Sequence, residues 1–523
     1  MPPSPKLLFI GVCAAEGDLI AEWAAAGVLP TFRSLIERGL TGRTQSVEAL
    51  FVQCNWPAFY TGTGPAKQGV HSWEQLQPGT YQFYRAYTPE HVRSTPFWDH
   101  LSLAGRRVAI FDIPHSQPSP RINGLQVCEW GAHDANYGLK TWPESLGPEL
   151  LATYGDHPQR GLCDAARNAD QMVAFRDGLL RGIAGKTAMT KHFLAQEPWD
   201  FFAQVFTESH CVGHQCWHLH DRNHPRFNER DFAVTGDPVK DVYVAIDRAI
   251  GEILETIEPD TRVVVLASHG MNAKYNPNFM LGDILERLGV AERKKPPPPP
   301  PLAGTRRLLD PILTRGWQML PGAAKALLQP MRRGLRDWVV EAADQRSDLP
   351  MGLEPSAGKC FLITNNHTHG GIRVNLAGRE PNGKVQPGAE YESLLAQLSR
   401  DLMEIKNVDT GKRIVNRMIR TSDLFSGELT AHFPDLMVEW SASAPVRAIH
   451  SDKIGRIEKE YTYCRTGEHN PAGMFFATGP GIAHGRMDRV VSIMDFAPTF
   501  CTLLGVHVEG LDGRPIPELL ASA

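Results

Sequence analysis

Histidines at a helical spacing stand directly after one of the apolar segments of this chain. His210 and His214 are four residues apart in Glu208-Ser209-His210-Cys211-Val212-Gly213-His214. If a helix begins here, the two imidazoles share one face, and their neutral ring nitrogens can hold one metal ion. Glu208 lies in the same turn and could transfer a proton. Such histidine pairs also occur without a metal, so the spacing alone leaves both interpretations open.

Two further histidines stand at the ends of apolar runs. His269 follows the run 262–267, and His469 lies in a loop rich in Gly and Pro before the run 474–477. In open α/β sheets, ligands bind beyond the carboxyl ends of the strands. Histidines from three remote segments therefore predict a metal site at one edge of a sheet.

The elements that must position these residues are short apolar runs, each followed by a loop and a segment with helical character. The runs 7–12, 107–111, 201–206 and 262–267 are typical of strands buried on both faces. They predict an α/β fold with a central, mostly parallel sheet between helices. The residues at the carboxyl ends of these strands are Cys13, Asp112, His210, Ser268 and His269.

One segment interrupts this pattern. Six prolines at 296–301 lead into a basic stretch, so 291–349 is predicted to be a Pro-rich, helical insertion between core segments 1–290 and 350–523. The basic stretch indicates either a surface for an anionic membrane or a partner chain, or a helical cap with a solvated face. A hairpin with an Asn-Gly turn is expected at 371–385.

Composition excludes several classes of protein. The 523 residues carry 54 basic and 58 acidic side chains, a net charge of −4, which gives no reason to expect a nucleic-acid polymer as partner. Nine cysteines without a regular spacing indicate reduced thiols and a cytoplasmic protein. The apolar run near the start is about six residues long, which favours a strand over a signal peptide.

Several motifs together resemble the type I phosphodiesterase/nucleotide pyrophosphatase family of the alkaline phosphatase superfamily. The resemblance covers nearly the whole chain apart from the insertion, and it implies an alkaline phosphatase-like three-layer sandwich. The matching motifs are Phe9-Ile10-Gly11-Val12, Leu29-Pro30-Thr31-Phe32, residues 56–65 around Thr61-Gly62, the segment 371–385, Asp495-Phe496-Ala497-Pro498-Thr499 and Leu511-Asp512-Gly513-Arg514.

The resemblance also implies a divergent active site. The family holds two divalent metals, usually zinc, beside a Thr or Ser nucleophile. Cys13, Val52, His210 and Ser268 stand where the family has an Asp, the nucleophile and two further Asp residues, whereas His214, His269 and His469 match family histidines. One zinc ion is therefore expected on His210, His214 and His469. Cys13 and His269 would form a second, weaker metal site.

The altered residues leave two functions open. Val52 cannot attack phosphorus, and Cys54 is either a substitute nucleophile or a packed thiol. The first hypothesis is a hydrolase of small phosphate esters in which water attacks directly, with Glu208 or His269 handling protons. Its expected substrate contacts are Asn55, His367 and His369, and a loop with Glu129, His133 and Asp134 would line the pocket. The second is a catalytically inactive binding or assembly module. Substrate identity and oligomeric state stay open.

Overall fold

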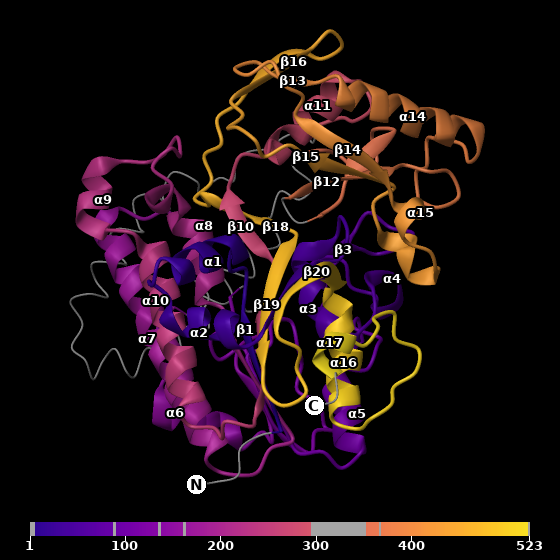
Figure 1. Cartoon of the computed structure of the whole chain (residues 1–523). Helices are drawn as coiled ribbons and strands as arrows, with labels where there is room; N and C mark the ends of the chain where they lie inside the picture. The colour runs from indigo at the N-terminus through magenta and orange to yellow at the C-terminus, as the bar shows by residue number, and fades with distance from the viewer. Residues whose placement is uncertain are drawn as a thin grey trace, which may run out of the picture.

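The computed structural model describes residues 6–86, 90–133, 137–159, 164–293, 352–365 and 368–520 (Figure 1). Most of the expected insertion at 291–349, with its basic surface for a membrane or a partner, lies outside the described residues, as does His367. The described residues form a large α/β body built on a nine-stranded sheet and a smaller lobe with its own sheets.

The body is organised around one mixed, mostly parallel sheet. Strand β1 (Leu7–Val12) lies at its centre and runs parallel to both of its neighbours, β8 and β9. Strand β19 is antiparallel to β9. The full order is β20 (Gly485–Ser492), β2 (Leu40–Gln45), β19 (Ala472–Thr478), β9 (Arg262–Ala267), β1, β8 (Phe201–Phe206), β5 (Val108–Phe111), β6 (Gly124–Cys128) and β7 (Lys140–Trp142).

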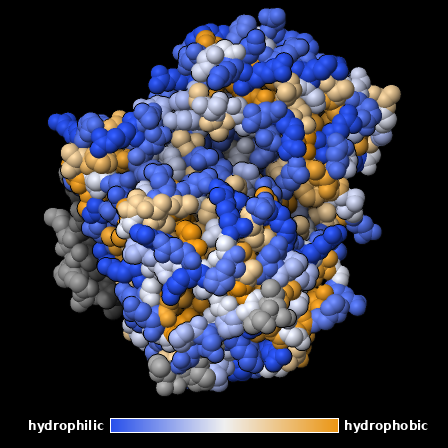
Figure 2. Space-filling model, in the orientation of Figure 1, coloured by the Kyte–Doolittle hydropathy of each residue, from blue (hydrophilic) through white to orange (hydrophobic). Residues whose placement is uncertain are grey.

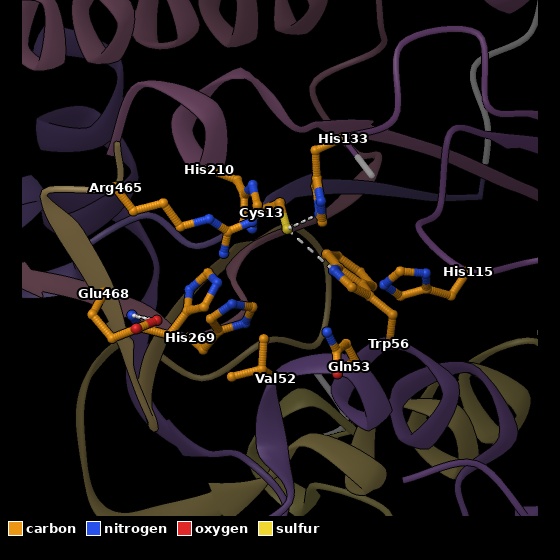
Figure 3. Close-up of a pocket in the computed structure, with 11 residues that line it drawn as sticks. Cys13, Val52, Gln53, Trp56, His115, His133, His210, His269, Arg465 and Glu468 are labelled. Carbon is orange, nitrogen blue, oxygen red and sulfur yellow. Dashed lines mark hydrogen bonds between the residues drawn. The ribbon is translucent and has the colours of Figure 1, made fainter. Parts of the chain in front are cut away.

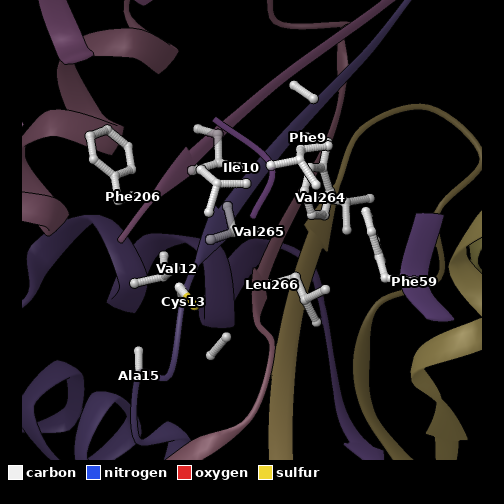
Figure 4. Close-up of a cluster of buried hydrophobic side chains, with 14 of the residues drawn as sticks. Phe9, Ile10, Val12, Cys13, Ala15, Phe59, Phe206, Val264, Val265 and Leu266 are labelled. Carbon is white, nitrogen blue, oxygen red and sulfur yellow. The ribbon is translucent and has the colours of Figure 1, made fainter. Parts of the chain in front are cut away.

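The apolar runs form the middle of this sheet, as the sequence predicts. Three of the predicted strands have the expected bounds, and β5 begins one residue later. Every side chain of β1 and β8 is buried. Phe9 of β1 stacks on Phe59 with ring centroids 4.8 Å apart, in the apolar cluster of Figure 4. Strands covered on both faces must be apolar throughout, so the predicted mostly parallel sheet between helices is confirmed.

Helices cover both faces of the sheet (Figure 1). Their starts follow from the sequence: Asn168 and Gln171 form a capping box before α7, and Asp237 caps α10 with Pro238 in its first turn. One face carries α1 (Gly17–Ala25), α2 (Pro30–Arg38), α7 (Ala169–Leu194), α8 (Glu208–His220) and α10 (Pro238–Leu254), and the other carries α3 (Phe51–Thr61), α5 (Phe97–Leu103) and α16 (Phe496–Leu503).

The smaller lobe has a separate apolar core around Leu281, Ile372 and Leu436. Its four-stranded sheet has the order β11 (Cys360–Leu362), β12 (His369–Val374), β15 (Leu436–Trp440) and β14 (Val415–Arg420), and a second sheet joins β13 (Lys406–Asn407), β16 (Ala448–Ser451) and β17 (Gly455–Glu458). Helices α11 (Leu281–Arg287) and α14 (Ala389–Met403) belong to this lobe. The molecular surface is hollowed between the lobe and the body (Figure 2).

Short elements complete the described chain. The helical ones are α4 (Pro65–Gln68), α6 (Leu146–Tyr154), α9 (Glu229–Thr235), α15 (Thr421–Leu424), α17 (Pro517–Leu520), η1 (Asn278–Met280), η2 (Glu428–His432) and η3 (Ile493–Asp495). The short strands pair as β3 (Glu74–Leu76) with β4 (Phe83–Arg85) and as β10 (Gly270–Ala273) with β18 (Gly467–Asn470).

The expected hairpin at 371–385 is wrong. Strand β12 pairs with β11 and β15, and Val385 makes only an isolated parallel bridge to Leu376. The reason is Arg373, which is 1% exposed and forms a 2.7 Å ion pair with Glu380. This pairing folds the segment after β12 back onto the strand, so the Asn-Gly turn closes a loop and not a hairpin.

Two further features of the described residues are the apolarity of the helices and the oxidation state of the cysteines. Within the described ranges, no single helix combines the length and apolarity needed to cross a membrane; α1 and α2 meet these criteria only together, across a 94° bend. Among the cysteines that the structure describes, seven are free thiols. Cys211, however, is disulfide-bonded, which corrects the expectation of reduced thiols throughout.

A pair of buried histidines lies where the smaller lobe meets the body. The rings of His71 and His432 are 5.3 Å apart, and His432 Nε2 donates to the carbonyl oxygen of Gly69 at 3.2 Å. Burial lowers the pKa of His432 to about 4, with Arg373 and Arg93 adding positive charge nearby. The pKa of His71 is also well below its usual value, through burial and then through His432. Both rings are therefore neutral near pH 7.

This pair predicts a loss of stability in mild acid. Because the pKa of His432 is lower in the folded chain, the unfolded chain takes up the proton first as the pH falls through about 6.5 toward 4. We expect His432→Gln to remove about 2 kcal/mol of the difference in unfolding free energy between pH 7 and pH 5. Denaturant unfolding at the two pH values measures it. An unchanged pH dependence in the variant would contradict this assignment.

Candidate metal centre and pocket

Three buried histidines converge beyond the carboxyl edge of the central sheet. His210 and His214 come from α8, and His469 comes from β18. One ligand atom from each lies within 4.8 Å of the others. The Nε2 atoms of His214 and His469 are 2.9 Å apart, and the ring centroids of His210 and His469 are 4.9 Å apart. The structure thus brings together the three imidazoles that the sequence analysis placed around one ion.

Two local features produce this convergence. Helix α8 begins two residues after β8 ends, which places His210 and His214 on one face above the sheet edge. Strand β10 follows shortly after the end of β9. Strand β18 pairs antiparallel with β10 and places His469 opposite Met271. Helix and strand approach closely because Gly467 has no side chain: a Cβ there would lie 2.2 Å from the carbonyl oxygen of Gly213.

Hydrogen bonds fix the orientation and the tautomer of His214. Its Nδ1 lies 2.8 Å from the carbonyl oxygen of Gly467, and since a carbonyl only accepts, Nδ1 carries the proton. Its Nε2 therefore presents a lone pair toward His469. A backbone carbonyl on the second ring nitrogen is the usual support of a metal-ligating histidine.

Burial keeps all three imidazoles neutral. It lowers the pKa of His214 to about 4, with a further contribution from the positive charge of Arg465. The pKa values of His210 and His469 are also well below the usual value, through burial and then through neighbouring histidines. Neutral imidazole is the form that binds metal, and three such ligands with an open position are typical of zinc sites. The residues present therefore fit a zinc ion.

Arg465 adds a positive charge beside this cluster. Its Nη1 donates to His214 Nε2 at 3.2 Å, the same lone pair that a metal would use. The guanidinium is held by Asp164, which accepts from Nη2 at 2.7 Å and from Nε at 2.8 Å. The carboxylate offsets the charge of the arginine and positions it. Arg465 therefore competes with an ion for His214, or moves aside when an ion binds.

A pocket opens next to the cluster (Figure 3). The cavity inside it has a volume of about 20 Å³, which is room for about one water molecule. Inside it, the Cys13 sulfur accepts a hydrogen bond from Trp56 Nε1 at 3.3 Å and lies 3.5 Å from His133 Nε2. The ring of His133 stacks on that of His210, with centroids 3.5 Å apart. The lining residues are Cys13, Val52, Gln53, Trp56, His115, His133, His210, His269, Arg465, Glu468 and His469.

Strained backbone marks the same edge of the sheet. Ala14, Asp112 and Glu129 follow β1, β5 and β6, with φ angles of 53°, 53° and 60°, and the pocket residue His115 has a φ of 60°. Residues other than glycine rarely adopt this left-handed backbone conformation, and those that do cluster at functional sites. The strain therefore supports the carboxyl edge of the sheet as the functional edge.

The residues expected to form a second metal site line the pocket without completing a cluster. Cys13 and His269 are both present in the lining, but Val52 of the same lining offers no ligand atom. In the part of the chain that the structure describes, the group of His210, His214 and His469 is the only one in which three or more potential ligands meet. The structure supports one candidate metal position.

Two candidate catalytic residues lie away from the pocket lining. The carboxylate of Glu208 accepts from His157 Nε2 at 3.0 Å and pairs with Lys186 of α7 at 3.3 Å. The Cys54 thiol donates to the carbonyl oxygen of Leu50 within its own helix, and burial raises its pKa far above the usual value. The structure thus favours a structural role for Glu208 and the packed-thiol alternative for Cys54.

The candidate substrate residues are also displaced. Asn55 is fully buried behind His269 and does not line the pocket. His369 is buried against Phe51, with ring centroids 6.0 Å apart, and burial lowers its pKa to about 4. Of the loop expected to line the pocket, His133 does so and Glu129 does not, because its carboxylate accepts from the backbone N–H of Gly138 at 2.7 Å. Asp134 lies outside the described residues.

Sequence reasoning missed five residues of the lining, which are Gln53, Trp56, His115, Arg465 and Glu468. Arg465 stands four residues before His469, in a segment where the histidine alone indicates a metal ligand. His115 follows strand β5 by four residues, so the rule about carboxyl ends of strands could have found it. Trp56 belongs to a motif that resembles the family, and nothing in the sequence indicates its hydrogen bond to Cys13.

The contacts of Glu208 predict a structural effect. Lys186 is fully buried and pairs with Glu208 and with Asp112 at 3.5 Å. Burial alone would raise the pKa of Glu208, but Lys186 and His157 lower it overall. We expect Glu208→Gln to cost about 3 kcal/mol of unfolding free energy and to leave zinc affinity unchanged. The matched control, Glu458→Gln in an exposed pair with Arg456, should cost less than about 0.5 kcal/mol. Loss of zinc affinity without loss of stability would show that Glu208 acts at the metal site and has no structural role.

Comparison with known proteins agrees with this architecture. The chain aligns over 99% of its length with all of alkaline phosphatase PafA, at a TM-score of 0.51 and 12% identity. Over 97% of its length, the chain also aligns with 96% of phosphonoacetate hydrolase from Sinorhizobium meliloti 1021, at a TM-score of 0.50 and 13% sequence identity. At such identities the likeness concerns the fold alone, which is alkaline phosphatase-like. No curated protein sequence matches.

The sequence itself gives the family. The family model described as "Type I phosphodiesterase / nucleotide pyrophosphatase" matches residues 7–439, which include β1, the pocket residues up to His269 and most of the smaller lobe. His469 of β18 and Arg465, just before that strand, lie beyond the matched range, in the segment that folds back against α8. The chain belongs to the type I phosphodiesterase/nucleotide pyrophosphatase family.

Proposed function

We propose that this chain hydrolyses phosphate esters of small molecules with the help of one divalent ion, most simply zinc, on His210, His214 and His469. The observation that carries the proposal is the meeting of three buried, neutral imidazoles at the functional edge of the sheet. Membership of a phosphoesterase family supports the reaction class. When bound, the ion supplies positive charge that stabilises a phosphoryl oxygen and lowers the pKa of water.

The pocket favours direct attack by water over a covalent intermediate. Val52 stands in the lining where the family has its nucleophile, and its side chain has no atom that can attack phosphorus. The Cys54 thiol is turned toward Leu50 and stays protonated. In a single displacement the bond from water oxygen to phosphorus forms while the ester bond breaks, and the alcohol leaves with a proton. Such a reaction inverts the configuration at phosphorus.

The chain's own residues would bind and orient the ester. Arg465 is the cation that borders the pocket, and the carboxylate of Asp164 holds its guanidinium in place. A guanidinium is suited to phosphoryl oxygens because it donates several parallel hydrogen bonds. His133 is an imidazole of the lining that is not assigned to the ion, so proton transfer would fall to it.

One observation favours the alternative of a catalytically inactive binding module. His214 Nε2 already accepts from Arg465 and contacts His469, so this network is hydrogen-bonded without an ion. A site kept for catalysis should bind zinc in spite of this competition. Metal content therefore separates the two functions.

The first test is zinc stoichiometry. We expect one equivalent of zinc per purified chain, lost in His210→Ala together with turnover of a generic aryl phosphodiester. The control is His220→Ala, at the end of the same helix, where the imidazole contacts Asp237 at 2.8 Å away from the cluster. That variant should keep both the ion and the activity. A chain without metal and turnover would favour the binding module, and net retention at phosphorus would refute direct attack.

Arg465 supports a second test with opposite effects on two readouts. Arg465→Met removes the donor and the charge that compete for His214, so zinc affinity, measured against a chelator, should rise about tenfold. The same variant loses a ligand for phosphoryl oxygens, so KM should rise. Arg447→Met, which removes an exposed cation, is the control. Weaker zinc binding in Arg465→Met would show that the arginine supports the site and does not compete.

A further inference from the structure

The side chain of Asn55 has a fixed orientation. This residue of α3 is fully buried, and its amide group lies 3.2 Å from the carbonyl oxygen of Ser268 and 3.3 Å from His269 Nδ1. A carbonyl oxygen can only accept, so the amide nitrogen of Asn55, and not its oxygen, must face this pair of atoms. Asn55 Nδ2 has two protons, one for each contact.

The orientation of Asn55 determines the tautomer of His269. Its Nδ1 faces the Asn55 amide protons, and the hydroxyl of Ser268, 3.1 Å away, can donate to the same atom. Nδ1 must therefore hold the lone pair, because an N–H at this position would point at the N–H of Asn55. In a neutral imidazole the proton then lies on Nε2.

The Nε2–H group of His269 is left without a partner among the described residues. It is a buried donor, and the residue as a whole is 2% exposed and lines the pocket beside Val52. A buried donor without an acceptor is costly, and natural proteins rarely keep one outside a binding site. An acceptor that enters the pocket would satisfy it.

We propose that His269 binds a non-bridging oxygen of the phosphate ester through Nε2–H, and that Asn55 is the positioning residue that holds the ring in this tautomer. This inference rests on the proposed function and specifies how the substrate is held. It also excludes a second metal site, because a protonated Nε2 cannot ligate an ion and Nδ1 is already bonded to Asn55. Cys13 alone then remains of the expected second site, with its sulfur bonded to Trp56.

The direct test is the tautomer, read by long-range nitrogen–proton NMR on histidine-labelled protein. The His269 signals are assigned by their absence in His269→Gln. We expect the pattern of an Nε2–H imidazole in the wild-type chain, whether or not zinc is bound. In Asn55→Asp the carboxylate can accept from Nδ1–H, so the pattern should switch to the other tautomer. An Nδ1–H pattern in the wild-type chain would overturn the inference.

The second test is binding of inorganic phosphate to the zinc-loaded chain by calorimetry. We expect affinity to fall about 10- to 100-fold in His269→Phe, which has no donor. His269→Gln should keep most of the affinity, because its amide N–H can replace Nε2–H. These variants leave the contact of Asn55 with Ser268 intact, so they remain informative if Asn55→Asp does not fold. Equal affinity in all three proteins would overturn the proposal.

Zinc stoichiometry distinguishes this inference from the proposed function. A second equivalent of zinc that disappears in His269→Phe would show that His269 is a metal ligand, and the inference would fail while the hydrolase remains. A chain that binds no zinc would remove the proposed function, and the tautomer measurement would still decide the state of His269. The two proposals therefore fail on different results.

Discussion

The contact between helix α8 and strand β18 is the constraint on which the candidate site depends. Several hydrogen bonds join the two segments, among them one from His214 Nδ1 to the carbonyl oxygen of Gly467, 253 residues away in the sequence, and one from the backbone N–H of Thr466 to the carbonyl oxygen of His214. They form because Gly467 and Gly213 approach without side chains between them. The same approach brings His469 within 2.9 Å of His214. A side chain at Gly467 would separate the helix from the strand, and the three imidazoles would no longer meet.

Neutral ligands change the electrostatics of the edge where the family resemblance implies carboxylates. Burial keeps the three histidines uncharged, so they would leave the charge of a bound cation unreduced, whereas carboxylates would offset part of it. An unreduced charge favours a bound phosphate ester, which is an anion. Neutrality also explains how Arg465 can lie 3.2 Å from His214, because a protonated imidazole at that distance would repel the guanidinium. Asp164 then offsets the arginine itself.

The sequence predicts the fold better than it predicts the site, for a physical reason. The strands β1, β8 and β9 are buried on both faces, so their apolar runs identify them and locate the carboxyl edge where Cys13, His210 and His269 lie. His469 stands beside a further apolar run, which predicts it at the same edge, and the family resemblance assigns it to the same ion as His210 and His214. Side-chain direction is harder to predict. Glu208 faces Lys186 on another helix, and Arg465 is fixed by a residue 301 positions away.

Two backbone carbonyl groups give the two sides of the pocket opposite hydrogen-bonding character. The Gly467 carbonyl fixes the proton of His214 on Nδ1, which leaves a lone pair on Nε2. The Ser268 carbonyl fixes the amide of Asn55, and through it the proton of His269 on Nε2. One imidazole therefore presents a lone pair for a cation and the other presents a donor for an anion. Because carbonyls cannot reverse their role, this polarity is a property of the fold, and it matches a phosphate ester held between an ion and a hydrogen-bond donor.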